Sequence, residues 1–225
     1  MLTKDKLIYD LLEIARAGRG SDDEPLTPEL VGFWIDNTRA ELIGQNVDKG
    51  RSINPDIIQV LPCVEIQQVD ASECGCESTG CFIYRTKLQL PTAVEISNGQ
   101  TLITRVAPIR IDSKAFSFLP YERFIWAGND RFTSNLPIAT LRNGYIYIKS
   151  KRFLGNKISV SLVANFPEEL GEFETCDGLT CYNKESKYPI SARMVETLKK
   201  KITDSNFKIS LNTKGDDINN ANGII

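Results

Sequence analysis

Residues 27–45, TPELVGFWIDNTRAELIGQ, predict a long amphipathic helix, and this helix limits how the rest of the chain can fold. Thr27 suits the N-cap, Pro28 suits the first helical position, and Glu29 adds negative charge near the positive end of the helix dipole. The expected inner face has helical spacing and consists of Leu30, Val31, Trp34, Ile35, Thr38, Leu42 and Ile43. The expected outer face is polar and consists of Asp36, Asn37, Arg39, Glu41 and Gln45. Because such an apolar face is unfavourable in water, other parts of the chain must cover it.

Two other helical segments are predicted to supply that cover. Residues 4–17 form a first helix, which Gly18 can end in the left-handed conformation. Residues 189–203 form a third helix that packs back near Trp34. The connector between the first two helices carries an acidic run at residues 22–24. We interpret this run as a solvated loop rather than as a site for a cation or a basic partner.

The hydrophobic period changes after Gly50, from that of a helix to that of a strand. Apolar and polar side chains alternate in residues 82–90 and again in residues 157–165. The pairs Asn98-Gly99 and Asn143-Gly144 are strong signals for hairpin turns. This part of the chain therefore predicts an antiparallel β region of about six to eight strands.

Together these segments predict an α+β fold with four parts. An N-terminal helical hairpin occupies residues 1–52, and a central antiparallel β-sandwich or barrel occupies residues 53–185. A C-terminal helix at residues 186–205 is expected to pack on the N-terminal helices. Residues 206–225 are expected to form an extended polar tail that a partner orders, with an apolar run at 207–211 that could add one strand.

The composition argues against several classes of function. The chain has 225 residues, a formal net charge of -2 and no histidine, so the commonest catalytic base and metal ligand is absent. No run of residues is long and apolar enough for a membrane span, and the N-terminus lacks the apolar core of a signal peptide. No concentrated basic stripe indicates a nucleic-acid binder. We therefore expect a protein that is not an enzyme and that needs no cofactor.

Two groups of residues allow a functional interpretation beside a structural one. A histidine-free enzyme would need paired carboxylates, and the candidates in the β region are Asp112, Glu122, Asp130 and Glu174. We interpret them as ordinary surface acids. The aromatic segment at residues 116–126 could stack nucleic-acid bases. Without a basic stripe beside it, a role in the core or in a subunit contact is favoured.

The six cysteines leave three interpretations open. Cys74, Cys76 and Cys81 lie in one loop of small residues, Cys176 and Cys181 lie in a second loop, and Cys63 stands alone on a predicted strand. Three thiolates from the first loop and one from the second could hold zinc, although the spacing is not a usual zinc pattern. The two loops could instead be clipped together by disulfides, or the thiols could be free.

The N-terminal sequence LIYDLLEIARAGRGSDDEPLTPELVGFWIDNTRAELIGQNVDKGRSINPDIIQ resembles virion structural proteins of crAss-like tailed phages. The matching features there are two helices around an acidic connector and a helix with Trp34 and the Arg39-Ala40 pair. Later matches follow in order along nearly the whole chain. They are the SEC loop at residues 72–74, a strand ending at Pro91, the Tyr-Pro-Ile run at 188–190 and the Asp-Ile-Asn-Asn run at 217–220.

This resemblance implies a ring protein of the head-to-tail connector, either a portal adaptor or a tail ring. Such proteins form rings of about twelve subunits beneath the portal, joining portal to tail and lining the DNA exit channel. The implied partners are further copies of the chain, the portal protein, neighbouring connector and tail rings, and viral DNA passing without sequence-specific contacts. The implied location is the virion, assembled in the bacterial host cytoplasm, with no membrane. The resemblance brings no catalytic, cofactor-binding or metal-binding residue. The alternative function is a β-rich binding module stapled by its cysteines through disulfides or zinc.

Overall fold

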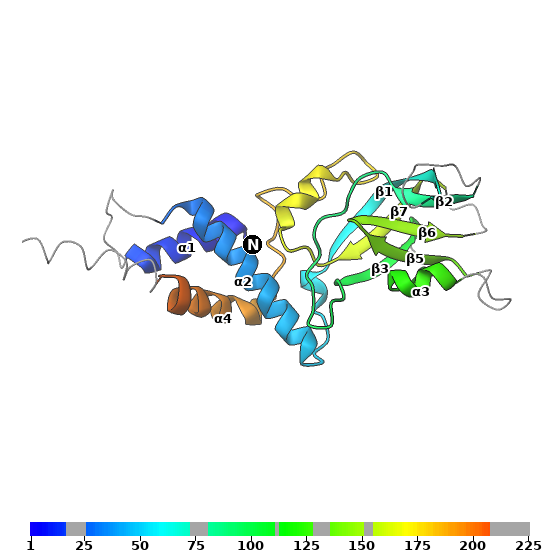
Figure 1. Ribbon diagram of the computed structural model, residues 1–225. Helices are drawn as coiled ribbons and strands as arrows, with labels where there is room; N and C mark the ends of the chain where they lie inside the picture. The colour runs from blue at the N-terminus through cyan, green and yellow to red at the C-terminus, as the bar shows by residue number, and fades with distance from the viewer. Residues whose placement is uncertain (17–25, 73–80, 111–112, 128–135, 151–154, 208–225) are drawn as a thin grey trace, which may run out of the picture. The chain divides into compact units, whose positions relative to one another are not determined.

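The computed structural model describes residues 1–16, 26–72, 81–110, 113–127, 136–150 and 155–207. The chain forms two compact units. The helical unit contains residues 1–57, 96–99 and the chain from 184 onward, and the β unit contains residues 58–95 and 100–183. Figure 1 shows the helices and strands of both units with the labels used below.

Three helices make up most of the helical unit: α1 (Lys4–Arg16), α2 (Pro28–Asp48) and α4 (Ala192–Ile202). Two short elements complete it, the 3-10 turn η1 (Pro55–Ile57) and the wide turn η3 (Thr203–Phe207). The hydroxyl oxygen of Thr27 accepts a hydrogen bond from the amide of Leu30, 3.3 Å away, so the predicted N-cap of α2 is confirmed. The core between the helices consists of Leu7, Leu11, Leu12, Leu26, Val31, Ile35, Leu42, Tyr188, Ile190, Leu198, Ile202 and Phe207.

The C-terminal part of the helical unit packs on its N-terminal helices. Helix α2 lies against both α1 and α4, and the ring of Phe207 lies 5.9 Å from the ring of Trp34, centroid to centroid. Helix α4 begins at Ala192, later than predicted, with Ser191 in the N-cap position. Phe207, which we expected at the start of a strand, is instead the last residue of η3. The remainder of that predicted strand lies outside the described residues.

The predicted division of α2 into an apolar and a polar face is wrong at three positions. Leu30, assigned to the inner face, is 37% exposed, whereas Asp36 and Arg39, assigned to the outer face, are 2% and 0% exposed. The cause is that α2 is covered on more than one side, by α1 and by α4. Charged side chains on a helix covered in this way must be buried, and they then need partners within the protein.

Seven strands form the sheet of the β unit: β1 (Gln59–Asp70), β2 (Phe82–Thr86), β3 (Ile103–Pro108), β4 (Ser117–Phe118), β5 (Ile138–Arg142), β6 (Tyr145–Lys149) and β7 (Lys157–Leu162). Their order is β3-β7-β1-β2-β6-β5-β4. The amide of Phe116, next to β4, donates to the carbonyl of Val106 on β3 at 2.8 Å, so the two edges of the sheet approach each other. The result is a nearly closed barrel, which confirms the α+β class and the barrel alternative.

The sheet is antiparallel except at one edge, where the two residues of β4 pair with β5 in parallel. The expectation of a purely antiparallel region is therefore wrong at this edge. The short helix α3 (Tyr121–Trp126) lies between β4 and β5 in the chain, and this connection lets β4 run in the same direction as β5. A 3-10 segment, η2 (Pro167–Glu172), follows β7.

One of the two predicted hairpin turns joins two strands directly. Asn143 and Gly144 have φ values of 52° and 78°, and the flanking Arg142 and Tyr145 pair across β5 and β6. At Gly99 the turn also forms, because its amide donates to the carbonyl of Ile96 at 2.9 Å. Its flanks, however, make only the isolated bridge between Glu95 and Thr101.

The predicted strand at residues 82–90 is shorter than its alternation suggested, since β2 ends at Thr86 and Leu88 is 56% exposed.

Candidate assembly surfaces

A buried polar network fixes the helices of the helical unit. The ammonium group of Lys4 on α1 donates to one carboxylate oxygen of Asp36 at 2.7 Å, and the hydroxyl of Tyr188 donates to the other, also at 2.7 Å. A side chain at Gly32 would bring its Cβ within 3.3 Å of Lys4 Cε. The glycine therefore leaves the space in which Lys4 reaches Asp36. This network connects α1, α2 and the segment before α4.

Arg39 makes further buried contacts with the segment of chain before α4. Its guanidinium donates to the carbonyl of Pro189 at 3.2 Å and lies 5.5 Å from the centroid of the Tyr188 ring. Tyr188 is itself completely buried. These contacts hold the chain just before α4 in place, and they explain why the Arg39 side chain is buried although it is charged.

Gly50 ends α2, and the residues that follow it line a groove. Gly50 has a φ of 72°, its amide donates to the carbonyl of Val47 at 2.8 Å, and the amide of Arg51 donates to the carbonyl of Asn46 at 3.1 Å. This pair of bonds is a Schellman motif, which reverses the chain at a helix C-terminus. Residues 51–57 then return beside α2. A salt bridge of 3.1 Å between Lys187 and Asp56 connects this returning segment to the chain before α4.

The groove lies among the C-terminal half of α2, residues 49–57 and the first two turns of α4, and has a volume of about 870 Å³. Three cations line it, namely Lys49, Arg51 and Arg193. None of the described residues that line it is acidic. Val47, Ile53 and Met194 add half-buried apolar side chains. The groove therefore offers positive charge above an apolar floor, which suits an acidic segment that also carries aliphatic side chains.

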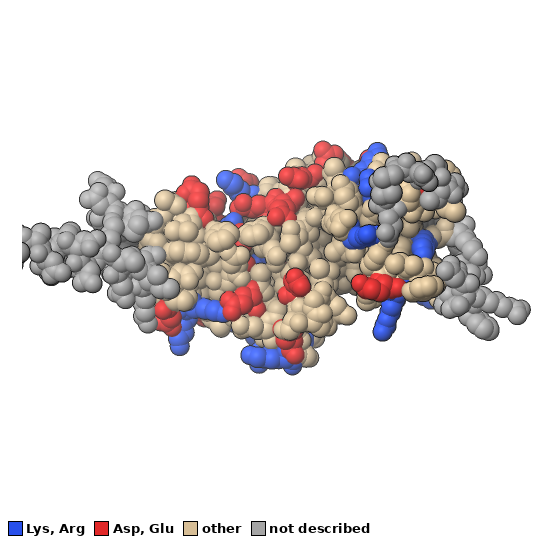
Figure 2. Space-filling model, in the orientation of Figure 1, with Lys and Arg blue, Asp and Glu red and all other residues tan. Residues whose placement is uncertain are grey.

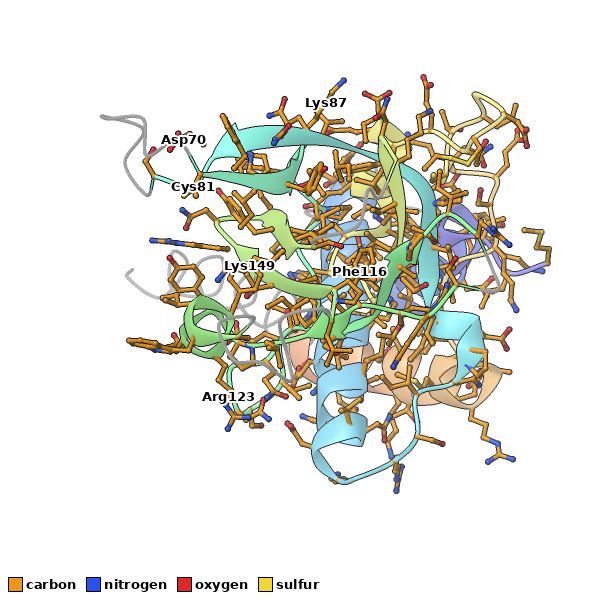
Figure 3. All side chains as sticks on the ribbon, turned by 90° about the vertical axis from the view of Figure 1, so that its right-hand side faces the viewer. Asp70, Cys81, Lys87, Phe116, Arg123 and Lys149 are labelled. Atoms are coloured by element: carbon orange, nitrogen blue, oxygen red, sulfur yellow. A yellow bond between two sulfur atoms is a disulfide. The ribbon has the colours of Figure 1, made fainter. Side chains whose placement is uncertain are left out.

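The β unit presents a different surface, around α3. The ammonium group of Lys149 donates to the carbonyls of Phe124 and Ile125 at 2.9 and 3.1 Å, which holds the C-terminal end of α3 against β6. Burial of this side chain lowers the pKa of Lys149. Figure 3 shows Lys149 on the same side of the β unit as Asp70 and Cys81. A pocket of about 290 Å³ lies here, lined by Asp70 and Lys149 among others.

Two adjacent apolar side chains of α3 are exposed beside that pocket. Ile125 lines it and is 43% exposed, and the next residue, Trp126, is 75% exposed. In contrast, Phe116 and Phe124 from the same predicted aromatic segment are buried, so the core interpretation of that segment is confirmed for these two residues. We call Ile125 and Trp126 the apolar patch of the β unit. Exposed aromatic side chains of this kind are typical of protein contacts.

The structure pairs two of the cysteines in a disulfide, Cys63 on β1 and Cys176, with 5.2 Å between their Cα atoms. Cys63 is thus not alone, and in the described residues the second cysteine loop is clipped to a strand rather than to the first loop. That second loop is a tight turn in which the amide of Thr175 donates to the carbonyl of Leu179 at 2.6 Å. Burial raises the pKa of the Cys181 thiol.

A zinc site in the first loop would need Cys74 and Cys76, which lie outside the described residues. Within the parts of the chain that are described, no group of three or more histidine, cysteine, aspartate or glutamate side chains is placed to hold a metal ion.

The four candidate carboxylates are not assembled into a catalytic pair where the structure describes them. Glu122 lies in the first turn of α3, whereas Glu174 lines a pocket of about 350 Å³ that it shares with Glu65 and Lys87. The hydrogen bond and charge of Lys87, 2.7 Å away, lower the pKa of Glu65, so that carboxylate is held ionised in a salt bridge. Asp112 and Asp130 lie outside the described residues.

The functional surfaces escaped the sequence-based predictions because each joins residues far apart in the chain. Arg193 reaches the groove from α4, whereas Lys49 and Arg51 follow α2. One local signal was present: Gly50 after a helix ending in Asp48-Lys49 indicates a C-terminal cap. Figure 2 shows acidic and basic side chains interspersed on the face it displays, without a broad field of one sign.

Comparison with known proteins places the chain in a family. No curated protein matches it in sequence. A family model described as "Phage tail ring protein 2" matches residues 6–223. No helix in the described part of the chain has the length and apolar character needed to cross a membrane. The match covers nearly the whole chain and confirms the resemblance drawn from its sequence patterns, so this protein belongs to the crAss-type phage tail ring protein 2 family.

Proposed function

We propose that this protein is a structural component of a phage virion that assembles into a closed ring within the head-to-tail connector. The observation that carries the proposal is the family match over residues 6–223. In this role the protein links the portal to the tail, either as a portal adaptor or as a tail ring, and it is not an enzyme. Its work is to hold neighbouring subunits and rings in register.

Ring formation requires that one patch of each subunit meets a different patch of the next. The protein has two unlike surfaces suited to such contacts, the cationic groove of the helical unit and the apolar patch of the β unit. Neither surface resembles the other in charge or polarity. A contact between identical patches would close as a dimer, whereas unlike patches permit a ring with more members.

The charge of the protein supports a role in lining the DNA exit channel. The formal net charge is -2, and acidic and basic side chains are interspersed on the face shown in Figure 2. A strongly basic lumen would neutralise phosphates and retain the DNA. A nearly neutral wall lets the genome pass without being held.

The proposal is tested by native mass spectrometry of the protein mixed with the portal ring of its phage. A discrete complex with a fixed number of copies per portal, about twelve, is expected for a portal adaptor. Rings that form without the portal would instead indicate a ring further down the tail. If neither species forms, and the protein is missing from purified virions, the proposed function is wrong.

A second candidate function is a cysteine-stapled binding module, which the Cys63–Cys176 disulfide favours. In that case the disulfide-clipped turn of the β unit would be the functional feature, and the protein would act without forming a ring. Intact mass measured with and without reductant and chelator separates the possibilities. A loss of mass equal to bound zinc would support the zinc form of the module, and an unchanged mass with chelator would remove it.

A further inference from the structure

We propose that the cationic groove of the helical unit binds residues 212–225 of a neighbouring copy of this chain. This inference rests on the proposed ring function, because a ring brings each copy of the chain into the same contact with the next copy. It adds the specific contact that joins the copies: one groove filled by one segment, repeated around the ring.

The chemistry of the groove selects its occupant. Lys49, Arg51 and Arg193 supply three positive charges, and Arg51 is also oriented by its hydrogen bond to the side-chain oxygen of Asn46, 2.9 Å away. Arg193 lies in the first turn of α4, which contains no acidic residue, so the positive end of that helix adds to the potential. The half-buried Val47, Ile53 and Met194 provide the apolar floor. A ligand that satisfies both features carries carboxylates and aliphatic side chains together.

The C-terminal segment has this combination. Residues 212–225 read NTKGDDINNANGII, in which Asp216 and Asp217 are adjacent and are followed by Ile218, with Ile224 and Ile225 further on. Four asparagines lie in the same stretch and can exchange hydrogen bonds with amide side chains lining the groove, such as those of Gln45 and Asn54. The adjacent aspartates match the guanidinium groups of Arg51 and Arg193, and the isoleucines match the apolar floor.

The direction of α4 favours a neighbouring copy over the subunit's own segment. The groove lies at the start of α4, at Ser191 and Arg193, whereas the described chain leaves the other end of that helix through η3. Phe207, the last described residue, is buried beside Trp34. The eleven residues of α4 span about 16 Å, and a subunit's own segment would have to reverse and run back along that length. The segment of a neighbouring copy can enter without reversing.

Nucleic acid is a poorer match for this groove. Three cations neutralise few phosphates, and the apolar floor offers nothing to a sugar-phosphate backbone. A DNA contact is therefore treated as an outcome that would overturn the inference.

The first experiment is zero-length carbodiimide cross-linking of the full-length protein, prepared as an equal mixture of ¹⁴N- and ¹⁵N-labelled chains. This reagent joins Lys49 to Asp216 or Asp217 only when the amine and carboxylate are in direct contact. If the contact joins two copies that mix at random, about half of the Lys49 cross-links should connect a ¹⁴N peptide to a ¹⁵N peptide. Such mixed cross-links would establish a contact between copies. Cross-links in which both peptides always carry the same label would show that each segment fills its own groove and would overturn the inference.

The second experiment exchanges the charges of the two sides. The variant R51E/R193E reverses the groove and D216K/D217K reverses the segment. Each is expected to weaken self-association about tenfold or more, as two ion pairs become repulsive. The control E172K/D177K makes the same change of charge as D216K/D217K at exposed sites of the β unit outside the apolar patch, and association should be unchanged. Mixing the two reversed proteins should restore association, because each reversed groove then meets a reversed segment and each native groove meets a native one.

These outcomes separate the inference from the function on which it rests. If rings form and all variants associate equally, the inference fails while the ring function stands. If no ring forms under any condition, the proposed function fails. Independently of that result, cross-links whose two peptides always carry the same label would overturn the inference. If R51E/R193E leaves association intact but abolishes binding of a labelled DNA duplex, the groove serves nucleic acid instead.

Discussion

The buried pair of Lys4 and Asp36 makes a sharp test of how the helical unit is held together. The change Asp36→Ala removes the carboxylate that accepts hydrogen bonds from both Lys4 and Tyr188. Breaking a buried ion pair by removing one partner costs about 3–5 kcal/mol. The Lys4 side chain is 10% exposed and can regain some hydration, which favours the lower end of that range. Alanine also returns about 0.5 kcal/mol through its better helix propensity. We therefore expect Asp36→Ala to lower the free energy of unfolding by about 3 kcal/mol.

The assay is guanidinium chloride unfolding followed by tryptophan fluorescence. The chain has two tryptophans, and Trp126→Phe in every protein leaves Trp34, which lies in the helical unit, as the only reporter. Glu13→Ala is the matched control, an exposed acid removed from α1, with an expected effect within about 0.5 kcal/mol. Adding Lys4→Met should cost less in the Asp36→Ala background than in the parent protein, with a coupling energy of about 1–3 kcal/mol. An Asp36→Ala effect no larger than that of Glu13→Ala would refute this account of the network.

Three further predictions concern the β unit. Cys63→Ser removes the disulfide to Cys176, which spans 113 residues of sequence, and should lower the free energy of unfolding by about 2–4 kcal/mol in oxidising buffer. In reducing buffer, the control condition, the variant and the parent should be equally stable. A stability difference that persists in reductant would contradict the disulfide as the cause. Trp126→Ser should leave thermal stability within about 0.5 kcal/mol of the parent because the side chain is 75% exposed, yet reduce ring formation in native mass spectrometry. Rings at parental yield would exclude the apolar patch from the subunit contact. Because Lys87 lowers the folded-state pKa of Glu65, this pair contributes stability above the ordinary glutamate pKa, and that stability is lost as the pH falls through the lowered value. When the free energy of unfolding is measured against pH, Glu65→Gln should lose less stability than the parent over that acidic window. An equal loss of stability in the two proteins would count against the pair.

Features that depend on a few neighbouring residues were predictable. The cap at Thr27 and the turn at Asn143-Gly144 are confirmed because each is decided by local backbone geometry: a hydroxyl that accepts an amide, and a pair of residues that tolerates positive φ. The alternation in residues 157–165 likewise indicated β7, whose Ile158, Val160 and Leu162 are completely buried.

The candidate surfaces were much less predictable. Nothing near Lys49 or Arg51 indicates that Arg193 shares their groove. Likewise, nothing near Ile125 indicates that Asp70 and Lys149 line the same pocket. The pairing of Cys63 with Cys176 is of the same kind, because β1 and the later turn are separated by 113 residues of sequence. Spacing along the chain carries little information about such encounters.

The sequence by itself therefore determined the kinds of element, their order and the family, because helix caps, turn residues and hydrophobic periods act over a few residues and recur as ordered patterns. The tertiary structure decided which side chains of α2 are buried. Asp36 and Arg39 look like surface residues in sequence, yet α1 and α4 pack against α2. Helix α1 supplies Lys4 as a partner, and the segment before α4 supplies Tyr188 and the carbonyl of Pro189. A charge can be buried only where distant segments bring it a partner, and that is a property of the folded chain rather than of any one stretch of it.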